Sequence, residues 1–228
     1  MLPIPSAAAG PAADAECVVL LHGIARSPSA MRKMERKLKE SGYIVANIGY
    51  DSRKKILQDL MEDVNKKIQS GCKAAPKMHI VGHSMGGLIT RAWLKKYRPK
   101  NLGRVVMIGT PNHGSEIADF MKNTYFFKSY FGPAGQQLIT DQDGFADIFV
   151  EKVDFELGII AGDRSMDPIS SVFLLPGKDD GKVSVASTKL DGMKDHIVLH
   201  AEHTFMPSNK KVIAQVLHFL QQSTFKHP

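Results

Sequence analysis

Two kinds of hydrophobic pattern alternate along this chain of 228 residues. Short continuous apolar runs, several of them rich in β-branched residues, are typical of strands buried on both faces of a parallel sheet. The stretches between them place apolar residues at helical spacing, as Ile56, Leu60, Val64 and Ile68 do. The pattern predicts strands at residues 17–21, 43–48, 78–81, 105–108, 157–161 and 197–199, and helices at about 27–40, 56–68, 88–97 and 209–221.

The first predicted helix has start and stop signals. Ser27 or Ser29 can cap its N-terminus, and Ser41-Gly42 ends it. Because strands and helices alternate, right-handed crossovers would build a mostly parallel, six-stranded sheet with helices on both faces. The predicted fold class is therefore α/β, and we expect a ligand to bind at the carboxyl ends of the strands.

The chain length suits one domain, which we expect to span residues 17–228. Residues 112–156 contain no convincing strand, and we expect a cap- or lid-like insertion there. Residues 1–16 are rich in alanine and proline and carry no lysine or arginine. Their small residues resemble the end of a cleaved signal peptide, although a disordered tail has the same composition. We expect an exported protein, periplasmic or secreted, with a cytoplasmic location as the alternative.

The net charge of +7 adds little to this picture. Positive residues are spread along the chain, without a long basic run interleaved with aromatics, so we expect no nucleic-acid partner and at most transient contact with a lipid surface. No apolar run is long enough to span a membrane. The two cysteines, Cys17 and Cys72, fit either two unrelated thiols or one disulfide, and they predict no zinc site.

A candidate nucleophile follows the third predicted strand. Residues 82–87 read GHSMGG, a G-x-S-x-G pattern between a strand and a helix. That context lifts the serine onto a sharp turn, with Gly82 and Gly86 small because neighbouring backbone crowds the turn. The helix N-terminus behind Ser84 favours developing negative charge. We predict that Ser84 is the nucleophile, although a glycine-rich turn with an incidental serine has the same letters.

Two backbone N–H groups are candidate donors to the oxyanion of a tetrahedral intermediate. Met85 follows the predicted nucleophile, where one donor is expected. The second donor is expected in the loop after the first strand, where residues 22–24 read HGI, and we assign it to Ile24. Each such donor is worth about 3 to 4 kcal/mol in catalysis. Taken alone, His22-Gly23 is equally an ordinary strand-ending turn.

A general base must activate the serine. A serine on a strand-to-helix turn of this kind is followed along the chain by the acid and then by the histidine, which lies in the loop after the last strand. This order excludes His79, before the nucleophile, and His218, in the final helix. His203, in the loop after the last strand, is the predicted base. His200, at the end of that strand, is the alternative.

The acid is expected after the fifth predicted strand. Asp180 precedes a turn-forming glycine and an alternating apolar segment, and we prefer it. Asp163 follows the strand directly and is second, although it could instead hold its loop through Arg164. The full set of candidate carboxylates is Asp163, Asp179, Asp180, Asp191 and Asp195.

Together these motifs resemble those of the small bacterial lipases and esterases of the α/β-hydrolase superfamily. The resemblance covers residues 17–222 and implies a catalytic triad of Ser84, Asp180 and His203, with Ile24 and Met85 as oxyanion donors. The step of 23 residues from Asp180 to His203 fits the compact members and favours Asp180 over Asp163. The matching motifs are LLHGI at 20–24, GHSMGG at 82–87, GTPNHGS at 109–115, Asp180-Gly181 and His203.

The chain also departs from larger members of that family. They follow the histidine with an acidic residue that helps to bind calcium, whereas residues 204–206 read TFM here, so we expect no calcium site. We also expect no other metal and no cofactor. Two leading antiparallel strands are missing, which implies a minimal six-stranded core. In that topology the strands that begin at Cys17 and after Cys72 are neighbours, so these cysteines can form a disulfide. Relatives of this kind are commonly exported.

The insertion holds a dense aromatic segment, YFFKSYF at 125–131. Phe126, Phe127 and Phe131 would line an apolar cap that favours fatty acyl esters, or would pack the insertion onto the sheet. The predicted activity is hydrolysis of carboxylic esters, from small molecules or lipids, through an acyl-enzyme. The alternatives are a thioesterase or acyltransferase with the same triad, and a non-catalytic binding scaffold, which the intact triad disfavours.

Overall fold

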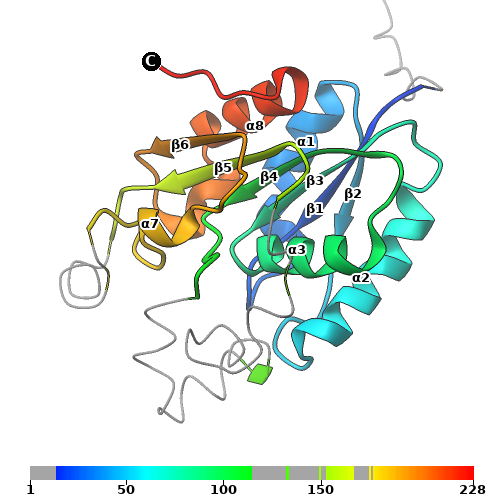
Figure 1. Cartoon of the computed structure of the whole chain (residues 1–228), viewed down its shortest axis with the longest axis horizontal. Coiled ribbons are helices and arrows are strands. Elements are labelled where there is room, and N and C mark those ends of the chain that lie inside the picture. The colour runs from blue at the N-terminus through cyan, green and yellow to red at the C-terminus, as the bar shows by residue number, and fades with distance from the viewer. Residues whose placement is uncertain (1–13, 115–131, 134–148, 150–152, 167–174, 176) are drawn as a thin grey trace, which may run out of the picture.

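The centre of the fold is a six-stranded sheet ordered β2-β1-β3-β4-β5-β6 (Figure 1). The computed structural model describes residues 14–114, 132–133, 149, 153–166, 175 and 177–228. All five strand pairings are parallel, so the predicted α/β class is confirmed, with a wholly parallel sheet in the described part of the chain. The strands are β1 (Cys17–Leu21), β2 (Ile44–Ile48), β3 (Met78–His83), β4 (Leu102–Ile108), β5 (Leu157–Gly162) and β6 (Asp195–Leu199).

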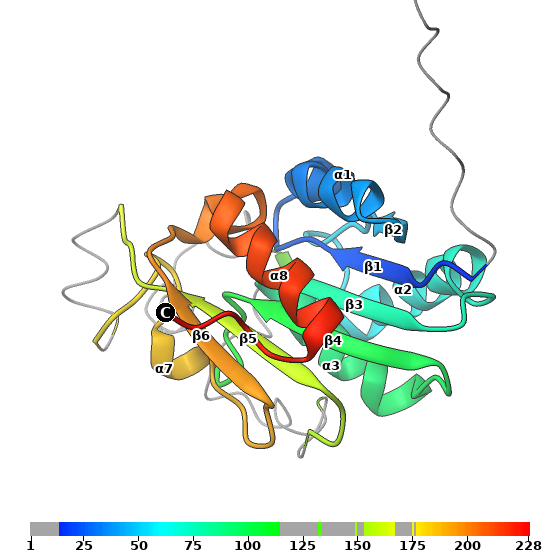
Figure 2. The same cartoon turned by 90° about the horizontal axis from the view of Figure 1, so that it is seen from above.

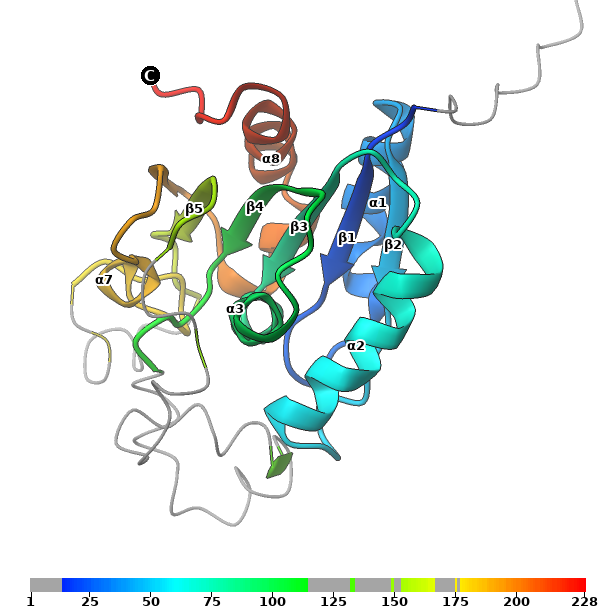
Figure 3. The ribbon, with the colours of Figure 1, turned by 45° about the vertical axis from the view of Figure 1, so that its right-hand side comes forward.

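Helices cover both faces of this sheet. The helices α1 (Arg32–Glu40) and α8 (Lys210–Gln222) lie side by side on one face (Figure 2). The helices α2 (Leu57–Gly71) and α3 (Met85–Tyr97) pack together on the other face, seen in front of the sheet in Figure 3. Short elements complete the described structure: η1 (Pro28–Met31), α7 (Val185–Thr188) and η3 (His203–Ser208).

The strand β1 shows why the apolar runs are continuous. All five of its residues are buried. Val18 and Leu20 point into the core beneath α1 and α8, whereas Val19 and Leu21 point into the core beneath α2 and α3. Because successive side chains face opposite sides of a strand and β1 has a core on each side, none of its five positions is polar.

The helix starts differ from prediction in two places. Neither Ser27 nor Ser29 caps α1, because Pro28 begins the 3-10 turn η1 first, and the two hydroxyls bond each other at 2.7 Å. The helix α3 begins at Met85 rather than residue 88. The stop signal at Ser41 is as expected. The last helix begins at Lys210, one residue after the expected start, and the Asn209 side chain caps it by accepting from the Lys211 N–H at 2.8 Å.

Cys17 and Cys72 form a disulfide with a Cα–Cα distance of 5.6 Å. It joins the first residue of β1 to the end of α2, and Cys17 lies beside Met78 of the neighbouring strand β3. The bridge therefore lies at the amino end of the strands. Among the described residues, no helix has the length and apolar character needed to cross a membrane.

Candidate functional site

The expected nucleophile lies on a strained turn between β3 and α3. Ser84 has a φ of 54° and a ψ of −123°, a backbone conformation that residues other than glycine rarely adopt. Such a conformation costs about 1 to 3 kcal/mol and persists only where the surroundings impose it. Here the Ser84 N–H donates to the carbonyl of Ile108 on β4 at 2.9 Å. The turn therefore presents the serine at the carboxyl end of the sheet.

Close backbone packing explains the glycines around this turn. A Cβ on Gly86 would lie 2.7 Å from the carbonyl carbon of Leu21 at the end of β1. A Cβ on Gly82 would lie 2.6 Å from the backbone nitrogen of Gly87. Because no side chain fits at either position, the N-terminus of α3 can rest directly on the end of β1.

Ser84, His203 and Asp180 form a hydrogen-bonded relay. The Nδ1 of His203 lies 2.7 Å from Oδ2 of Asp180, and its Nε2 lies 3.1 Å from Oγ of Ser84. Since a carboxylate only accepts, Nδ1–H is the donor, which leaves Nε2 free to accept the serine proton. All three residues are buried, with exposed fractions of 8%, 5% and 0% for Ser84, His203 and Asp180. This is the arrangement that nucleophilic catalysis by a hydroxyl requires.

The carboxylate of Asp180 is oriented by its own turn. Its Oδ1 accepts from the backbone N–H groups of Lys182 at 3.1 Å and Val183 at 2.9 Å. The Asp180 carbonyl also accepts from the His203 N–H at 3.0 Å. The turn residue Gly181 has a φ of 92°, which accounts for the Asp-Gly signal in the sequence.

A glycine at the end of β4 makes room for this pair. Gly109 has a φ of 54°, and a Cβ there would lie 3.0 Å from Oδ2 of Asp180 and 3.2 Å from Nδ1 of His203. Sequence reasoning did not single out Gly109, although it belongs to the GTPNHGS segment that carried the resemblance.

The alternative acid and base lie elsewhere. Asp163 pairs with His200 at 3.1 Å, and the His200 side chain is 72% exposed. Asp195 accepts from the Phe225 N–H at 2.6 Å. The remaining carboxylates also have other surroundings, because Asp191 is exposed and Asp179 accepts from the Gly181 N–H at 2.7 Å.

The loop after β1 lies against the expected nucleophile. A Cβ on Gly23 would lie 3.2 Å from Cβ of Ser84, so the backbone of residues 23–24 borders the serine. The next residue, Ala25, has a φ of 54° and donates its N–H to the buried hydroxyl of Ser52 at 3.0 Å. Met85 is the first residue of α3, and the first N–H groups of a helix have no carbonyl within it to bond.

His22 and Tyr50 support that loop from behind. Their rings stack with centroids 4.0 Å apart, and the Tyr50 hydroxyl donates to the His22 carbonyl. Burial raises the pKa of Tyr50 well above its usual value, so the hydroxyl remains a donor. Neither Tyr50 nor Ser52 was identified from the sequence, because each lies about 27 residues from its partner.

A buried arginine contacts two described residues of the segment 112–156, which is expected to form a cap. The Nη1 of Arg91, on α3, lies 2.9 Å from the carbonyl of Asn112, and its guanidinium stacks 4.7 Å from the ring centre of Phe149. Burial lowers the pKa of Arg91 to about 10. The predicted cap residues Phe126, Phe127 and Phe131 lie outside the described residues.

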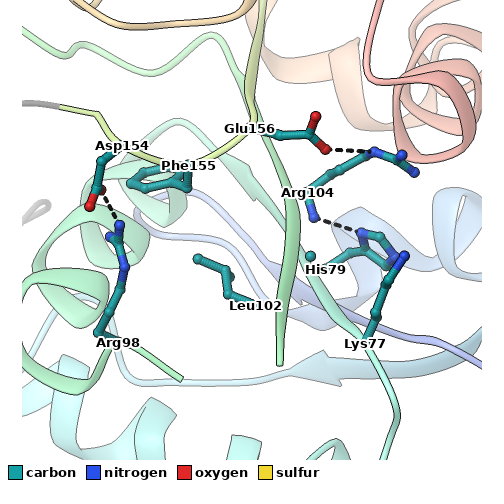
Figure 4. A pocket seen from close by; sticks show the side chains of 9 residues that line it. Lys77, His79, Arg98, Leu102, Arg104, Asp154, Phe155 and Glu156 are labelled. Carbon is teal, nitrogen blue, oxygen red and sulfur yellow. Dashed lines mark hydrogen bonds and ion pairs between the residues drawn. The ribbon is translucent and has the colours of Figure 1, made fainter. Parts of the chain in front are cut away.

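A cavity of about 360 Å³ lies at the opposite end of the strands from Ser84 (Figure 4). Arg104 and Glu156 form an ion pair of 3.0 Å on one wall, and Arg98 pairs with Asp154 on another. Opposite charges therefore neutralise each other around it. No group of three or more His, Cys, Asp or Glu side chains that could hold a metal ion occurs in the described parts of the chain.

Comparison with known proteins shows which family and which relatives this chain resembles in sequence. A profile of the palmitoyl protein thioesterase family matches residues 17–150, more than half of the chain. Two triacylglycerol lipases, from Pseudarthrobacter phenanthrenivorans and Burkholderia plantarii, are each 43% identical over 49 residues. That segment is 22% of this chain but only 15% and 13% of the two lipases.

Solved structures share the fold across nearly the whole chain. The mature lipase of Bacillus licheniformis superposes with a TM-score of 0.73 at 20% identity, covering 95% of both chains. A carboxylesterase structure from Nitrososphaera gargenis superposes with a TM-score of 0.63 at 17% identity, covering 94% of this chain and 93% of the other. The expected α/β-hydrolase fold of lipases and esterases is thereby confirmed.

Proposed function

Because this chain belongs to the palmitoyl protein thioesterase family, we propose that it is a serine hydrolase that cleaves carboxylic esters through an acyl-enzyme on Ser84. One observation carries the proposal: a hydroxyl, an imidazole and a carboxylate joined at 3.1 and 2.7 Å on the strained turn after β3. The likeness in sequence to triacylglycerol lipases supports the same reaction class.

In the proposed reaction, His203 takes the proton of Ser84 while Oγ attacks the ester carbonyl carbon. Asp180 holds the imidazole in the required tautomer and stabilises the imidazolium. The N–H groups of Met85 and Ile24 donate to the oxyanion. His203 then protonates the leaving alcohol, and a water molecule, activated by the same imidazole, releases the acid and restores Ser84.

The proposed substrates are fatty acyl or other small apolar esters, with residues 112–156 as a cap over the acyl chain. The buried contacts of Arg91 with Asn112 and Phe149 support this assignment, because they join two residues of this segment to α3, the helix that begins directly after Ser84.

A second candidate is the hydrolysis of acyl thioesters. The match to the palmitoyl protein thioesterase family favours it, because that family is described by this reaction. The same triad serves both reactions, so the two candidates differ only in the leaving group and its binding site.

Hydrolysis of p-nitrophenyl esters from acetyl to palmitoyl, beside the matching acyl-thioesters, tests both candidates. We expect wild type to be active and Ser84→Ala to lose about 10⁴-fold or more in kcat, as removal of a serine nucleophile does. The ratio of kcat/KM for ester and thioester of equal chain length then ranks the two reactions. A Ser84→Ala variant as active as wild type, or a wild type inactive on every substrate, would contradict the proposal.

A further inference from the structure

The residue before Ser84 makes a contact across the site that the triad does not account for. His83, the last residue of β3, is 3% exposed, and its Nε2 lies 3.0 Å from the backbone carbonyl of His203, 120 positions away. A carbonyl oxygen only accepts hydrogen bonds, so Nε2–H of His83 is the donor. The strand that carries the serine is therefore tied to the backbone of the residue that carries the base.

We propose that His83 is a positioning residue for the reaction, which fixes the imidazole of His203 in reach of Ser84 through the His203 carbonyl. The inference rests on the proposed function, because it concerns the geometry of that triad. His83 is assigned no contact with substrate and acts only through His203.

Two hydrogen bonds join the backbone of His203 to two other segments of the chain. Its N–H donates to the Asp180 carbonyl at 3.0 Å, and its carbonyl accepts from His83. The first bond ties the residue to the Asp180 turn. The second ties it to β3, the strand whose end is followed by Ser84.

The surroundings of His83 keep it a neutral donor. The loop after β1 packs against the Nδ1 side of the ring, since a Cβ on Gly23 would lie 3.2 Å from that atom. Among the described residues, Nδ1 has no hydrogen-bond partner. Burial lowers the pKa of His83 well below its ordinary value, and the neighbouring His203 acts in the same direction. The two ring centres are 4.9 Å apart, so a charged His83 would repel a positive charge on His203, whereas a neutral His83 does not.

The test compares His83→Met with His83→Gln. The two side chains have nearly the same length and volume, but only the glutamine amide can donate to the His203 carbonyl. A displacement of about 1 Å at a reacting group can cost about 100-fold in rate. We expect His83→Met to lower kcat by about 30- to 100-fold with KM within about 2-fold, and His83→Gln to recover kcat to within about 5-fold of wild type.

His79→Met is the matched control. His79 lies on the same strand, its side chain is 1% exposed, and it also makes two hydrogen bonds, with Glu16 and with the Arg104 N–H, both at 2.9 Å. Those contacts are at the end of β3 away from Ser84. We expect His79→Met to lower the thermal midpoint of unfolding without changing kcat. The control therefore separates a general loss of stability from a displacement of the His203 imidazole.

A second readout is the rate at which a fluorophosphonate probe labels Ser84, because labelling needs the activated serine but no ester turnover. It should fall in His83→Met by the same factor as kcat. Should His83→Met fail to fold, His83→Asn replaces it, since its shorter amide overlays Nδ1 rather than Nε2.

The inference is overturned if His83→Met keeps kcat within about 3-fold of wild type, if His83→Gln is as slow as His83→Met, or if His79→Met slows the reaction equally. Each of these results leaves the proposed function standing, because wild type still hydrolyses esters and is labelled at Ser84. A wild type that neither hydrolyses esters nor takes the probe overturns the proposed function itself, and the inference with it.

Discussion

At the scale of single residues, one carboxylate has two separate tasks. The Oδ1 of Asp180 is occupied by two backbone N–H groups of its own turn, and Oδ2 faces Nδ1 of His203. The side chain cannot rotate without losing both sets of bonds. Its orientation is thus set by the fold before any substrate arrives, which is the preorganisation that efficient proton transfer needs.

Changing Asp180 to Asn should therefore impair the reaction without unfolding the protein. Oδ1 would still accept from the turn, and the amide N–H₂ would then face Nδ1 of His203. That forces the proton onto Nε2, which can no longer accept from Ser84. We expect kcat for ester hydrolysis to fall about 10⁴-fold, with a circular dichroism spectrum like that of wild type.

Asp163→Asn is the control for that experiment, because Asp163 contacts the exposed His200 rather than His203. Its kcat should remain within about 2-fold of wild type, as for most surface changes. If the Asp163→Asn variant were inactive and the Asp180→Asn variant active, the acid would have been assigned to the wrong carboxylate.

At the scale of elements, the site depends on how closely α3 approaches β1. Gly86 in the first turn of α3 lies against the carbonyl group of Leu21, and Leu21 directly precedes the loop with the expected oxyanion donor. This contact holds the start of α3 against the end of β1, beside the loop in which Gly23 lies against Ser84. The geometry between helix and strand is therefore part of the site.

Gly86→Ala should separate the two elements. The new methyl group would lie 2.7 Å from the Leu21 carbonyl carbon, and main chain cannot give way as a flexible side chain can. We expect the free energy of unfolding in urea to fall by about 2 to 3 kcal/mol. Gly71→Ala is the matched control in α2, where the nearest atom is the Ala46 methyl at 3.2 Å, and its stability should stay within about 1 kcal/mol of wild type. Equal effects at both positions would contradict this interpretation.

The elements themselves could largely be predicted, because the strands contain short runs of buried apolar residues and most of the long helices place their buried residues at helical spacing. The ends were less predictable. The pattern stopped β3 at residue 81 and began α3 at residue 88, since glycines and a histidine look like a loop. In the structure Gly86 and Gly87 are helical despite their low propensity, because close packing outweighs it, of Gly86 against Leu21 and of Gly87 against Thr110.

Motif and chain order selected Ser84 and His203, and the Asp-Gly turn together with the spacing of the resembling family selected Asp180. The three residues lie together, and their catalytic roles stay predictions. The supporting contacts could not be predicted in the same way. The bonds of His83 with His203 and of Arg91 with Asn112 join residues far apart along the chain, and no local periodicity marks such partners.

At the scale of the whole molecule, the disulfide joins residues 55 positions apart. A crosslink of this kind acts mainly by restricting the unfolded chain. It also fits the expectation of export, because disulfides persist in oxidising compartments. Since the bridge lies at the amino end of the strands and Ser84 at the carboxyl end, we expect it to support stability rather than catalysis.

Replacing both Cys17 and Cys72 by Ala should lower the free energy of unfolding by up to about 4 kcal/mol, as the entropy of a loop this long suggests. Guanidinium unfolding with and without reductant measures the effect. Reductant should lower the midpoint of wild type and leave the double variant unchanged, and kcat of the folded variant should equal that of wild type. A double variant with the same midpoint as oxidised wild type would show that the bridge does not stabilise the fold.

The separation of the relay along the chain has a consequence for the timing of synthesis. Ser84 and His203 are 119 residues apart, with the serine first. At a translation rate of about 5 to 20 residues per second, His203 is made roughly 6 to 24 seconds after Ser84. Throughout that interval the nascent chain carries the proposed nucleophile without its proposed base. The proposed reactivity toward esters therefore cannot arise before the ribosome has translated the chain through His203.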